Sequence, residues 1–243
     1  MSRKRLDVLL VERGLFESRA KARAAVEAGK VTVDGRPASK PSEVVLGTAA
    51  IAAEAAHPWV GRGALKLVHA LDLWPAPVEG RTVLDVGAST GGFTEVCLSR
   101  GAARVYAVDV GKGQLHPKLR ADPRVVGLEQ TDARALTAEL VPEPPQLIVC
   151  DVSFIGLGKA LPAALALAAP GAHLVTLVKP QFEVGPDKVG KGGLVKDEAD
   201  RRQALQDVER FLTASGWRVQ ASADSPILGG EGAREYLLWA ARL

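Results

Sequence analysis

Cysteine is scarce in this sequence of 243 residues, which contains only Cys97 and Cys150. Both lie within apolar runs, so we expect buried core residues of a reducing compartment and neither a disulfide nor a ligand pair. The four histidines, at positions 57, 69, 116 and 173, have unrelated spacings and no cysteine close by. This pattern lacks the spacing of a zinc site, and we expect no metal.

Long hydrophobic segments are also absent. The most apolar stretches, residues 45–56 and 160–172, are too short, too rich in alanine or too interrupted by Pro162 and Pro170 to span a bilayer. No apolar segment follows the basic residues at the N-terminus, so the sequence shows no secretory signal. We therefore expect a cytoplasmic protein without a membrane partner.

The net charge of +3 is small, but it is unevenly distributed. Residues 1–40 contain ten lysines and arginines against five acidic residues, a net charge of +5, which leaves −2 for the remainder. The composition, 47% hydrophobic and 24% charged, is that of a folded protein. This charge distribution predicts a small, basic module that binds nucleic acid, attached to a nearly neutral body.

The length suits one or two domains, and the patterning places a boundary near residue 58. Leucines at helical spacing predict a helix that ends at Gly14, and Ser18 is placed to cap a second helix over residues 19–28. A hairpin is expected around Asp34-Gly35, and the alanine-rich stretch 49–56 is either a boundary or a final strand. Residues 1–58 thus form one expected domain and residues 59–243 the other.

The expected second domain alternates strands with helices. After a helix at 62–73, strands are expected at 82–86, 104–109, 125–128, 146–151 and 173–179. Helices are expected between or after them, at 92–100, 112–121, 156–168 and 198–214. The last two strands, 217–223 and 235–241, are consecutive. We therefore predict an α/β, Rossmann-like fold: a mostly parallel seven-stranded sheet with helices on both faces and a terminal antiparallel hairpin.

A glycine-rich turn follows the first strand of this sheet, in residues 85–94 (Asp-Val-Gly-Ala-Ser-Thr-Gly-Gly-Phe-Thr). Such a turn lets a ligand approach the backbone at the carboxyl ends of the strands. Asp109 ends the second strand and Asp132 follows the third, where they are placed to bind ribose hydroxyls and an adenine amino group. Each acid alone is equally compatible with a helix cap or a solvated turn. The glycine turn lacks the motif that binds the pyrophosphate of a dinucleotide. Acids at successive strand ends beside such a turn therefore favour a cofactor that contains adenosine but no pyrophosphate, which is S-adenosylmethionine.

Two further charged residues follow neighbouring strands, Asp151 after the fourth and Lys179 after the fifth. Parallel strands that are adjacent place both residues at one edge. Burial disfavours the charged ammonium of a lysine, which suits a general base. A purely structural ion pair between Lys179 and Asp151 explains the same pattern, and the two alternatives remain open at this point.

A glycine- and lysine-rich loop at residues 185–192 imitates a phosphate-binding P-loop. Gly192 stands where that motif requires Ser or Thr to bind magnesium, and the loop lies far from the first strand. We reject a nucleoside-triphosphatase. Lys188 and Lys191 then belong either to a mobile segment that contacts RNA or to a plain surface loop.

The motifs together resemble the FtsJ-like RNA ribose 2′-O-methyltransferases, and the whole chain resembles the haemolysin-A (TlyA-type) ribosomal RNA methyltransferases. The resemblance rests on residues 62–67 and 87–94, on Asp151, on residues 178–184 and on residues 232–236. Residues 1–58 resemble the S-four RNA-binding module. One departure is visible, because this chain has Gly-Ala-Arg-Glu-Tyr where the family is expected to have Gly-Asn before the acid.

The resemblance implies a catalytic Lys-Asp-Lys-Glu tetrad of Lys66, Asp151, Lys179 and Glu235 and implies S-adenosylmethionine as cofactor, without a metal. Lys179 would take or steer the proton of the ribose 2′-hydroxyl, and the other three would orient the hydroxyl or one another. The expected cofactor-binding residues are Asp85, Gly87, Ala88, Ser89, Thr90, Gly91, Gly92, Phe93, Thr94, Asp109, Val110, Asp132, Ala133 and Asp151.

The expected RNA contacts are basic residues of both domains: Arg3, Arg5, Arg19, Lys21, Arg23, Lys30, Arg36, Arg62, Lys188 and Lys191. A solvated charged face is the alternative for those in the first domain. Few aromatics interleave with them, so contacts to phosphate and shape are expected. The implied substrate is ribosomal RNA or a ribosomal subunit, with a large-subunit cytidine favoured and the small subunit possible. One alternative is a methyltransferase that acts on another RNA or on a small molecule. The other is a protein without catalytic activity, either RNA-binding or membrane-active like a haemolysin.

Overall fold

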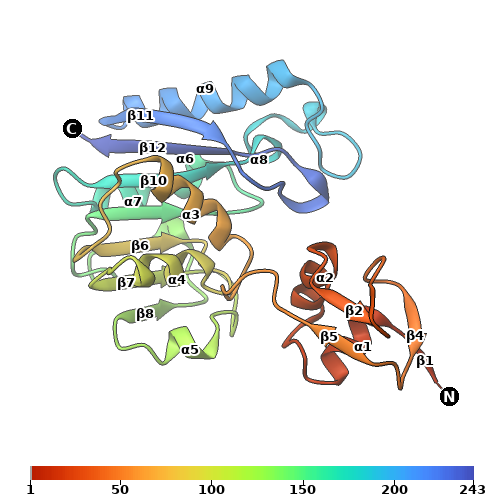
Figure 1. Cartoon of the computed structure of the whole chain (residues 1–243). Helices are drawn as coiled ribbons and strands as arrows, with labels where there is room; N and C mark the ends of the chain where they lie inside the picture. The colour runs from red at the N-terminus through yellow and green to blue at the C-terminus, as the bar shows by residue number, and fades with distance from the viewer. Residues whose placement is uncertain (1) are drawn as a thin grey trace. The chain divides into compact units, whose positions relative to one another are not determined.

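The computed structural model describes residues 2–243, and the chain divides into two units, Met1–Pro58 and Trp59–Leu243. In the ribbon of Figure 1 the first unit is coloured red to orange. Each unit has hydrophobic core residues of its own. The core of the first lies between Leu6 and Val45, whereas the cores of the second begin at Val60. Separate cores give each unit its own source of stability.

The first unit combines two helices with short strands. Its elements are β1 (Arg3–Arg5), α1 (Leu6–Glu12), α2 (Arg19–Glu27), β2 (Val31–Val33), β3 (Arg36–Pro37), β4 (Val44–Leu46) and β5 (Ile51–Ala53). The Ser18 side chain caps α2 by accepting a hydrogen bond from the Lys21 backbone N–H. The expected hairpin is β2–β3, and the alanine-rich stretch supplies β5, which pairs with β2. The pair β1–β4 was not predicted, because strands of three residues show no clear alternation.

The second unit is built on one seven-stranded sheet. Its strands are β6 (Thr82–Val86), β7 (Arg104–Val108), β8 (Val125–Leu128), β9 (Leu147–Cys150), β10 (His173–Val178), β11 (Trp217–Asp224) and β12 (Tyr236–Arg242). They lie in the order β11-β12-β10-β9-β6-β7-β8. Within this sheet, β12 runs opposite to the other six strands, so its pairs with β10 and β11 are antiparallel and the remaining pairs are parallel. The predicted mostly parallel sheet with a terminal antiparallel hairpin is confirmed.

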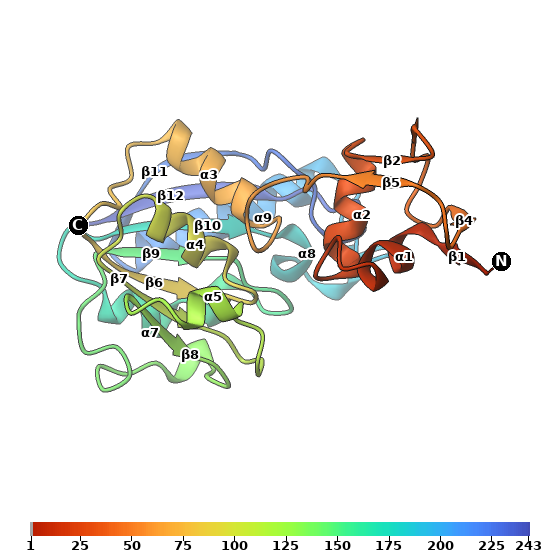
Figure 2. The ribbon, with the colours of Figure 1, turned by 60° about the horizontal axis from the view of Figure 1, so that its bottom comes forward.

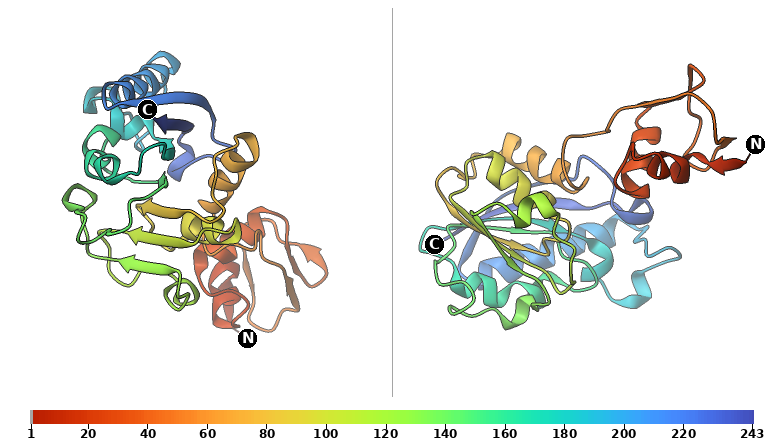
Figure 3. Two further views of the ribbon diagram at one scale, coloured as in Figure 1. Left: turned by 90° about the vertical axis from the view of Figure 1, so that its left-hand side faces the viewer. Right: turned by 90° about the horizontal axis from the view of Figure 1, so that it is seen from below.

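Helices cover both faces of this sheet (Figures 2 and 3). One face packs against α3 (Ala64–Leu73), α4 (Gly92–Ser99) and α5 (Pro117–Arg120). The other packs against α6 (Leu157–Ala160), α7 (Pro162–Leu167) and α9 (Glu198–Ala214). Neighbouring strand residues alternate between the two cores, as Val83 and Leu84 do. Strands buried on both sides explain the continuous apolar runs in the sequence.

The antiparallel strand β12 brings a distant part of the chain to the carboxyl edge of the sheet. Val178, the last residue of β10, lies opposite Tyr236, the first residue of β12. Lys179 directly follows Val178, and Glu235 directly precedes Tyr236. Both residues therefore emerge at the edge where β6, β7 and β9 also end, which is where ligands bind in open α/β sheets.

Two expected helices differ from the observed ones. In the stretch 112–121 only Pro117–Arg120 is helical, because Gly111 and Gly113 precede it and Pro117 starts a new turn. The stretch 156–168 is divided into α6 and α7, since Pro162 lacks the N–H that a continuous helix needs. Within residues 2–243, we find no helix with the length and apolar character to cross a membrane.

Candidate active site

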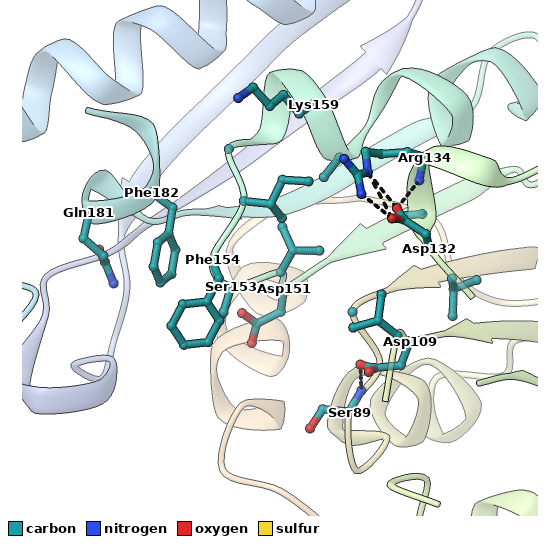
Figure 4. A pocket seen from close by; sticks show the side chains of 18 of the residues that line it. Ser89, Asp109, Asp132, Arg134, Asp151, Ser153, Phe154, Lys159, Gln181 and Phe182 are labelled. Atoms are coloured by element: carbon teal, nitrogen blue, oxygen red, sulfur yellow. Dashed lines mark hydrogen bonds and ion pairs between the residues drawn. The ribbon is translucent and has the colours of Figure 1, made fainter. Parts of the chain in front are cut away.

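A cavity of about 1130 Å³ opens at the carboxyl edge of the sheet (Figure 4). Its walls come from the segments that follow β6, β7, β8 and β9 and from α8 (Pro180–Glu183). Seven of the expected cofactor residues line it: Gly87, Ser89, Asp109, Val110, Asp132, Ala133 and Asp151. Loops after successive parallel strands thus converge on one space, as the topology requires.

The glycine turn after β6 approaches the loop after β9 very closely. Gly87 has φ +84°, and a Cβ atom there would lie 2.8 Å from the backbone oxygen of Asp151. Asp109 stabilises the same turn, because its carboxylate accepts hydrogen bonds from the backbone N–H groups of Ser89 at 2.8 Å and Gly111 at 2.7 Å (Figure 4). The ends of β6, β7 and β9 are thereby tied together around the cavity.

Asp85 does not line the cavity, contrary to the expectation from sequence. Its side chain is fully buried beneath the turn, where it accepts a hydrogen bond from the Thr94 hydroxyl at 2.6 Å. Burial raises the pKa of Asp85 to about 7, although the Thr94 hydrogen bond acts in the opposite direction. The pair therefore supports the turn from below. The expected contacts Ala88, Thr90, Gly91, Gly92 and Phe93 also lie outside the cavity wall.

Asp132 lines the cavity but already has a partner. Its carboxylate binds the Arg134 guanidinium, with Nε 3.0 Å from Oδ1, and caps the short helix η1 (Ala133–Ala135) through the Arg134 backbone N–H (Figure 4). These hydrogen bonds lower the pKa of Asp132 to about 2. The capping role that we considered for a single acid is thus observed here.

Asp151 and Lys179 form an ion pair at the edge of the cavity. The Lys179 ammonium lies 2.6 Å from Oδ1 of Asp151 and donates a hydrogen bond to the Ser153 hydroxyl at 2.9 Å. Lys179 is buried, whereas Asp151 is partly exposed. The expected proximity of the two residues is confirmed, and Ser153 is a partner that the sequence did not indicate.

Lys66 and Glu235 form a second, more deeply buried ion pair. The ammonium of Lys66 donates to Oε2 of Glu235 at 2.5 Å, and both residues are buried. The start of α3 lies against Asp151, since a Cβ atom on Gly63 would be 3.4 Å from its Oδ2. The carboxyl edge of the sheet and α3 therefore hold two cations and two carboxylates as two ion pairs, and one of these carboxylates, that of Asp151, lines the cavity.

Comparison with known proteins agrees with this geometry. Residues 59–242 match the model of the FtsJ-like methyltransferase family, and residues 4–51 match that of the S4 domain. The chain belongs to the FtsJ-like methyltransferases.

Relatives that match most of this methyltransferase are known. It is 49% identical to the 16S/23S rRNA (cytidine-2′-O)-methyltransferase TlyA of Mycobacterium tuberculosis, over 98% of this chain and 89% of the relative. It is 38% identical to the 23S rRNA (cytidine-2′-O)-methyltransferase TlyA of Campylobacter jejuni, over 74% of this chain and 70% of the relative. A solved structure described as a haemolysin from Streptococcus thermophilus is 39% identical, with a TM-score of 0.79, and covers 100% of this chain and 89% of its own.

Arg62, an expected RNA contact of the methyltransferase unit, binds the protein itself. Its guanidinium donates to the backbone oxygen of Leu228 at 2.5 Å and to that of Gly229 at 3.4 Å. Gly229 in turn packs against the Glu235 side chain so closely that a Cβ atom there would overlap it. Arg62 therefore ties the start of α3 to the loop that leads to Glu235.

Aromatic residues at the cavity were missed by the sequence reasoning. Phe154 follows β9, has a side chain that is 91% exposed and adopts φ +65°, a conformation that is rare for a bulky residue. Its ring lies 5.2 Å from that of Phe182, and both residues line the cavity (Figure 4). The sequence did contain a signal for Phe154, because this residue lies three positions after Asp151 and close to the end of a strand.

The expected RNA-binding residues of the first unit are exposed or partly exposed, and several are paired. Arg5 and Arg19 both bind Asp7, which is fully buried. The hydrogen bond from Arg5 is the largest cause that holds the pKa of Asp7 well below its usual range. Other ion pairs are Lys21 with Glu17, Arg23 with Glu27, Lys30 with Glu54 and, in the second unit, Lys188 with Asp200. Arg3, Arg36 and Lys191 are exposed.

Metal-binding groups were sought over the same part of the chain. Among residues 2–243, no three His, Cys, Asp or Glu side chains cluster in a way that could hold a metal ion. Cys97 and Cys150 are buried and free, which confirms their expected place in the core.

Proposed function

We propose that this protein transfers a methyl group from S-adenosylmethionine to the ribose 2′-hydroxyl of a cytidine in ribosomal RNA. The observation that carries the proposal is a set of two ion pairs, Lys66 with Glu235 and Lys179 with Asp151, at the carboxyl edge of the sheet, where Asp151 lines the cavity. Both TlyA relatives carry 23S in their names and one also carries 16S. Large-subunit RNA is therefore the favoured substrate and small-subunit RNA the second.

The cavity suits the cofactor in size and in chemistry. Its volume of about 1130 Å³ is ample for one small cofactor, and the turn at Gly87 and Ser89 presents backbone at its wall. Asp109 would hold the ribose hydroxyls, since each carboxylate oxygen retains a lone pair beyond its backbone hydrogen bond. Asp132 and Ala133 would face the adenine. Bound S-adenosylmethionine supplies a sulfonium methyl group as the electrophile.

The tetrad would prepare the ribose hydroxyl for attack. A 2′-hydroxyl is a weak nucleophile, so it needs a base and an exact position. The Lys179 amine, once deprotonated, accepts the hydroxyl proton at Nζ, while Asp151 and Ser153 fix the position of that nitrogen. Lys66 and Glu235, joined by their own ion pair, would orient the hydroxyl or one another.

The first unit would bind the RNA. Its S4 match and its basic residues, such as Arg3 and Arg36, support contacts to phosphate. The substrate class would place the protein in the cytoplasm, where ribosomes are found.

Phe154 offers the face of an exposed ring at the cavity, which suits the stacking of a base removed from its helix.

The deciding experiment is incubation of the purified protein with radiolabelled S-adenosylmethionine and isolated ribosomal subunits, followed by mapping of the labelled nucleotide. We expect label on a ribose 2′-oxygen of cytidine. Label on a base or on protein would contradict the reaction type.

The proposed base is tested by Lys179→Ala in the same assay. We expect loss of methyl transfer with nearly normal cofactor binding, measured by calorimetry. The matched control is Lys118→Ala, because Lys118 is an exposed lysine of α5 that pairs with Glu95 outside the cavity wall. Turnover retained by Lys179→Ala would exclude Lys179 as the base.

A further inference from the structure

A second, smaller cavity of about 150 Å³ lies next to the tetrad. Its wall includes Pro180, which follows Lys179, and Arg234, which precedes Glu235. Gln181 lines both this cavity and the large one (Figure 4). The two cavities are therefore neighbours.

The small cavity is lined by cations and by no acid among the described residues. Lys196, Arg201 and Arg234 come from three different places: the loop before α9, α9 itself and the loop before β12. The Arg201 guanidinium is held in place, because one of its nitrogens donates to the backbone oxygens of Val195 at 2.9 Å and Lys196 at 2.6 Å. These carbonyls fix its position without neutralising its charge.

Glu198 is an acid near this group of cations, but its hydrogen bonds go elsewhere. It accepts from Arg202 at 2.7 and 2.9 Å, and this interaction is the first cause of its lowered pKa. The charges of Arg201 and Arg234 lower the pKa of Glu198 further. Both guanidinium groups therefore lie in one neighbourhood and keep donors for an anion.

We propose that this cavity binds the RNA phosphate on the 3′ side of the methyl-accepting ribose. The inference rests on the proposed function. In RNA the 2′-hydroxyl and the 3′-phosphate are attached to adjacent ring carbons, so a hydroxyl held at Lys179 places a phosphate close by. Arginine pairs match the oxygens of a phosphate. The volume is well below the roughly 300 Å³ of a site for a larger organic ligand.

The test measures steady-state methylation of ribosomal subunits by Arg234→Ala and Lys196→Ala at several salt concentrations. We expect the KM for RNA to rise about tenfold, with kcat within about twofold. The slope of log affinity against log salt should become shallower by roughly 0.7–0.9 for each lost phosphate contact. The Kd for S-adenosylmethionine should stay constant, and Arg234→Lys should restore part of the loss.

The matched control is Arg210→Ala, an exposed arginine of the same helix that pairs with Asp207 and does not line the cavity. If the two test variants keep the KM and salt slope of this control while the unaltered protein methylates RNA, the phosphate site is wrong. A loss in kcat alone would also overturn it, because it would mean an effect through Glu235. Absence of methylation by the unaltered protein would instead overturn the proposed function, and this inference with it.

Discussion

Gly87 sets the distance between the cofactor turn and the loop that carries Asp151. Gly87→Ala would place a Cβ atom 2.8 Å from the backbone of Asp151 and would also strain a residue at φ +84°. The strain costs roughly 1–3 kcal/mol, and the overlap displaces Asp151 in addition. We expect the rate of methyl transfer to fall more than tenfold. The rate should be measured at a temperature at which thermal unfolding shows that the variant is still folded.

Gly80→Ala separates strain from overlap. Gly80 has φ +68°, but no atom lies within 4 Å of a Cβ atom placed there. This variant should lose stability and keep its activity. Equal loss of activity in both variants would show that strain alone explains the effect at Gly87.

Asp85 makes stability depend on pH. Its pKa rises from an ordinary value of 3.8 to about 7 in the folded protein, so the folded state binds more protons than the unfolded state between these values. The free energy of unfolding should therefore fall as pH rises from about 4 to 7, by up to about 1.4 kcal/mol per pH unit, and then level off. Urea unfolding at pH 5, 6, 7 and 8 measures this slope.

Asp85→Asn keeps an acceptor for the Thr94 hydroxyl but cannot ionise. It should flatten the pH dependence over this range. A variant with the same slope as the unaltered protein would assign the titration to another group.

At the level of single residues, the sequence indicated partners only where the sheet dictated them. Asp151 and Lys179 follow adjacent strands, so their proximity follows from the topology. The pairing of Asp132 with Arg134 depends on the conformation of a loop, which no periodic pattern reveals. Phe154 was missed for the same reason, because its φ of +65° is a property of the folded loop.

Among the elements, the long buried strands and α9 were the most predictable. The expected strand 82–86 and the helix 198–214 agree with the observed bounds, because the strand has a buried apolar pattern and Asp197 caps the helix. The bounds of strand 125–128 also agree, although it is short and only partly buried. The position of β12 between β10 and β11 is not encoded locally. It follows from tertiary packing, and it is what brings Glu235 to Lys66.

The link between α3 and the loop before β12 gives a prediction for Arg62. Arg62→Ala removes both hydrogen bonds to the backbone at Leu228 and Gly229, which frees the loop next to Glu235. We expect kcat to fall several-fold, with little change in the salt dependence of RNA binding. A shallower salt slope with unchanged kcat would mean that Arg62 contacts phosphate, as the sequence had suggested.

Arg100→Ala is the control for loss of an exposed arginine. Arg100 pairs with Asp72 on the surface, and such pairs contribute about 0–1 kcal/mol. Stopped-flow and steady-state rates of this variant should match those of the unaltered protein.

For the whole molecule, the two separate cores predict that the second unit keeps its structure alone. A chain that begins at Trp59 retains this residue, which packs against the core of the second unit. We expect weaker RNA binding with a shallower salt dependence, because the basic residues of the first unit are gone. The affinity for S-adenosylmethionine should change much less, which calorimetry can measure.

Unchanged RNA affinity in this truncated protein would contradict the assignment of RNA binding to the first unit. A separate titration of residues 1–58 with ribosomal RNA provides the complementary measurement, and it should show salt-dependent binding without any methyl transfer.

The ion pair between Lys66 and Glu235 also affects the order in which the second unit folds. The two residues are 169 positions apart, and Glu235 directly precedes the last strand. Contacts between such distant residues form late in folding, because a long loop must close first. We therefore expect this ion pair to form after the local helices and the parallel strand pairs of the second unit. A folding intermediate of this unit would contain most of the sheet and still lack the contact between Lys66 and Glu235.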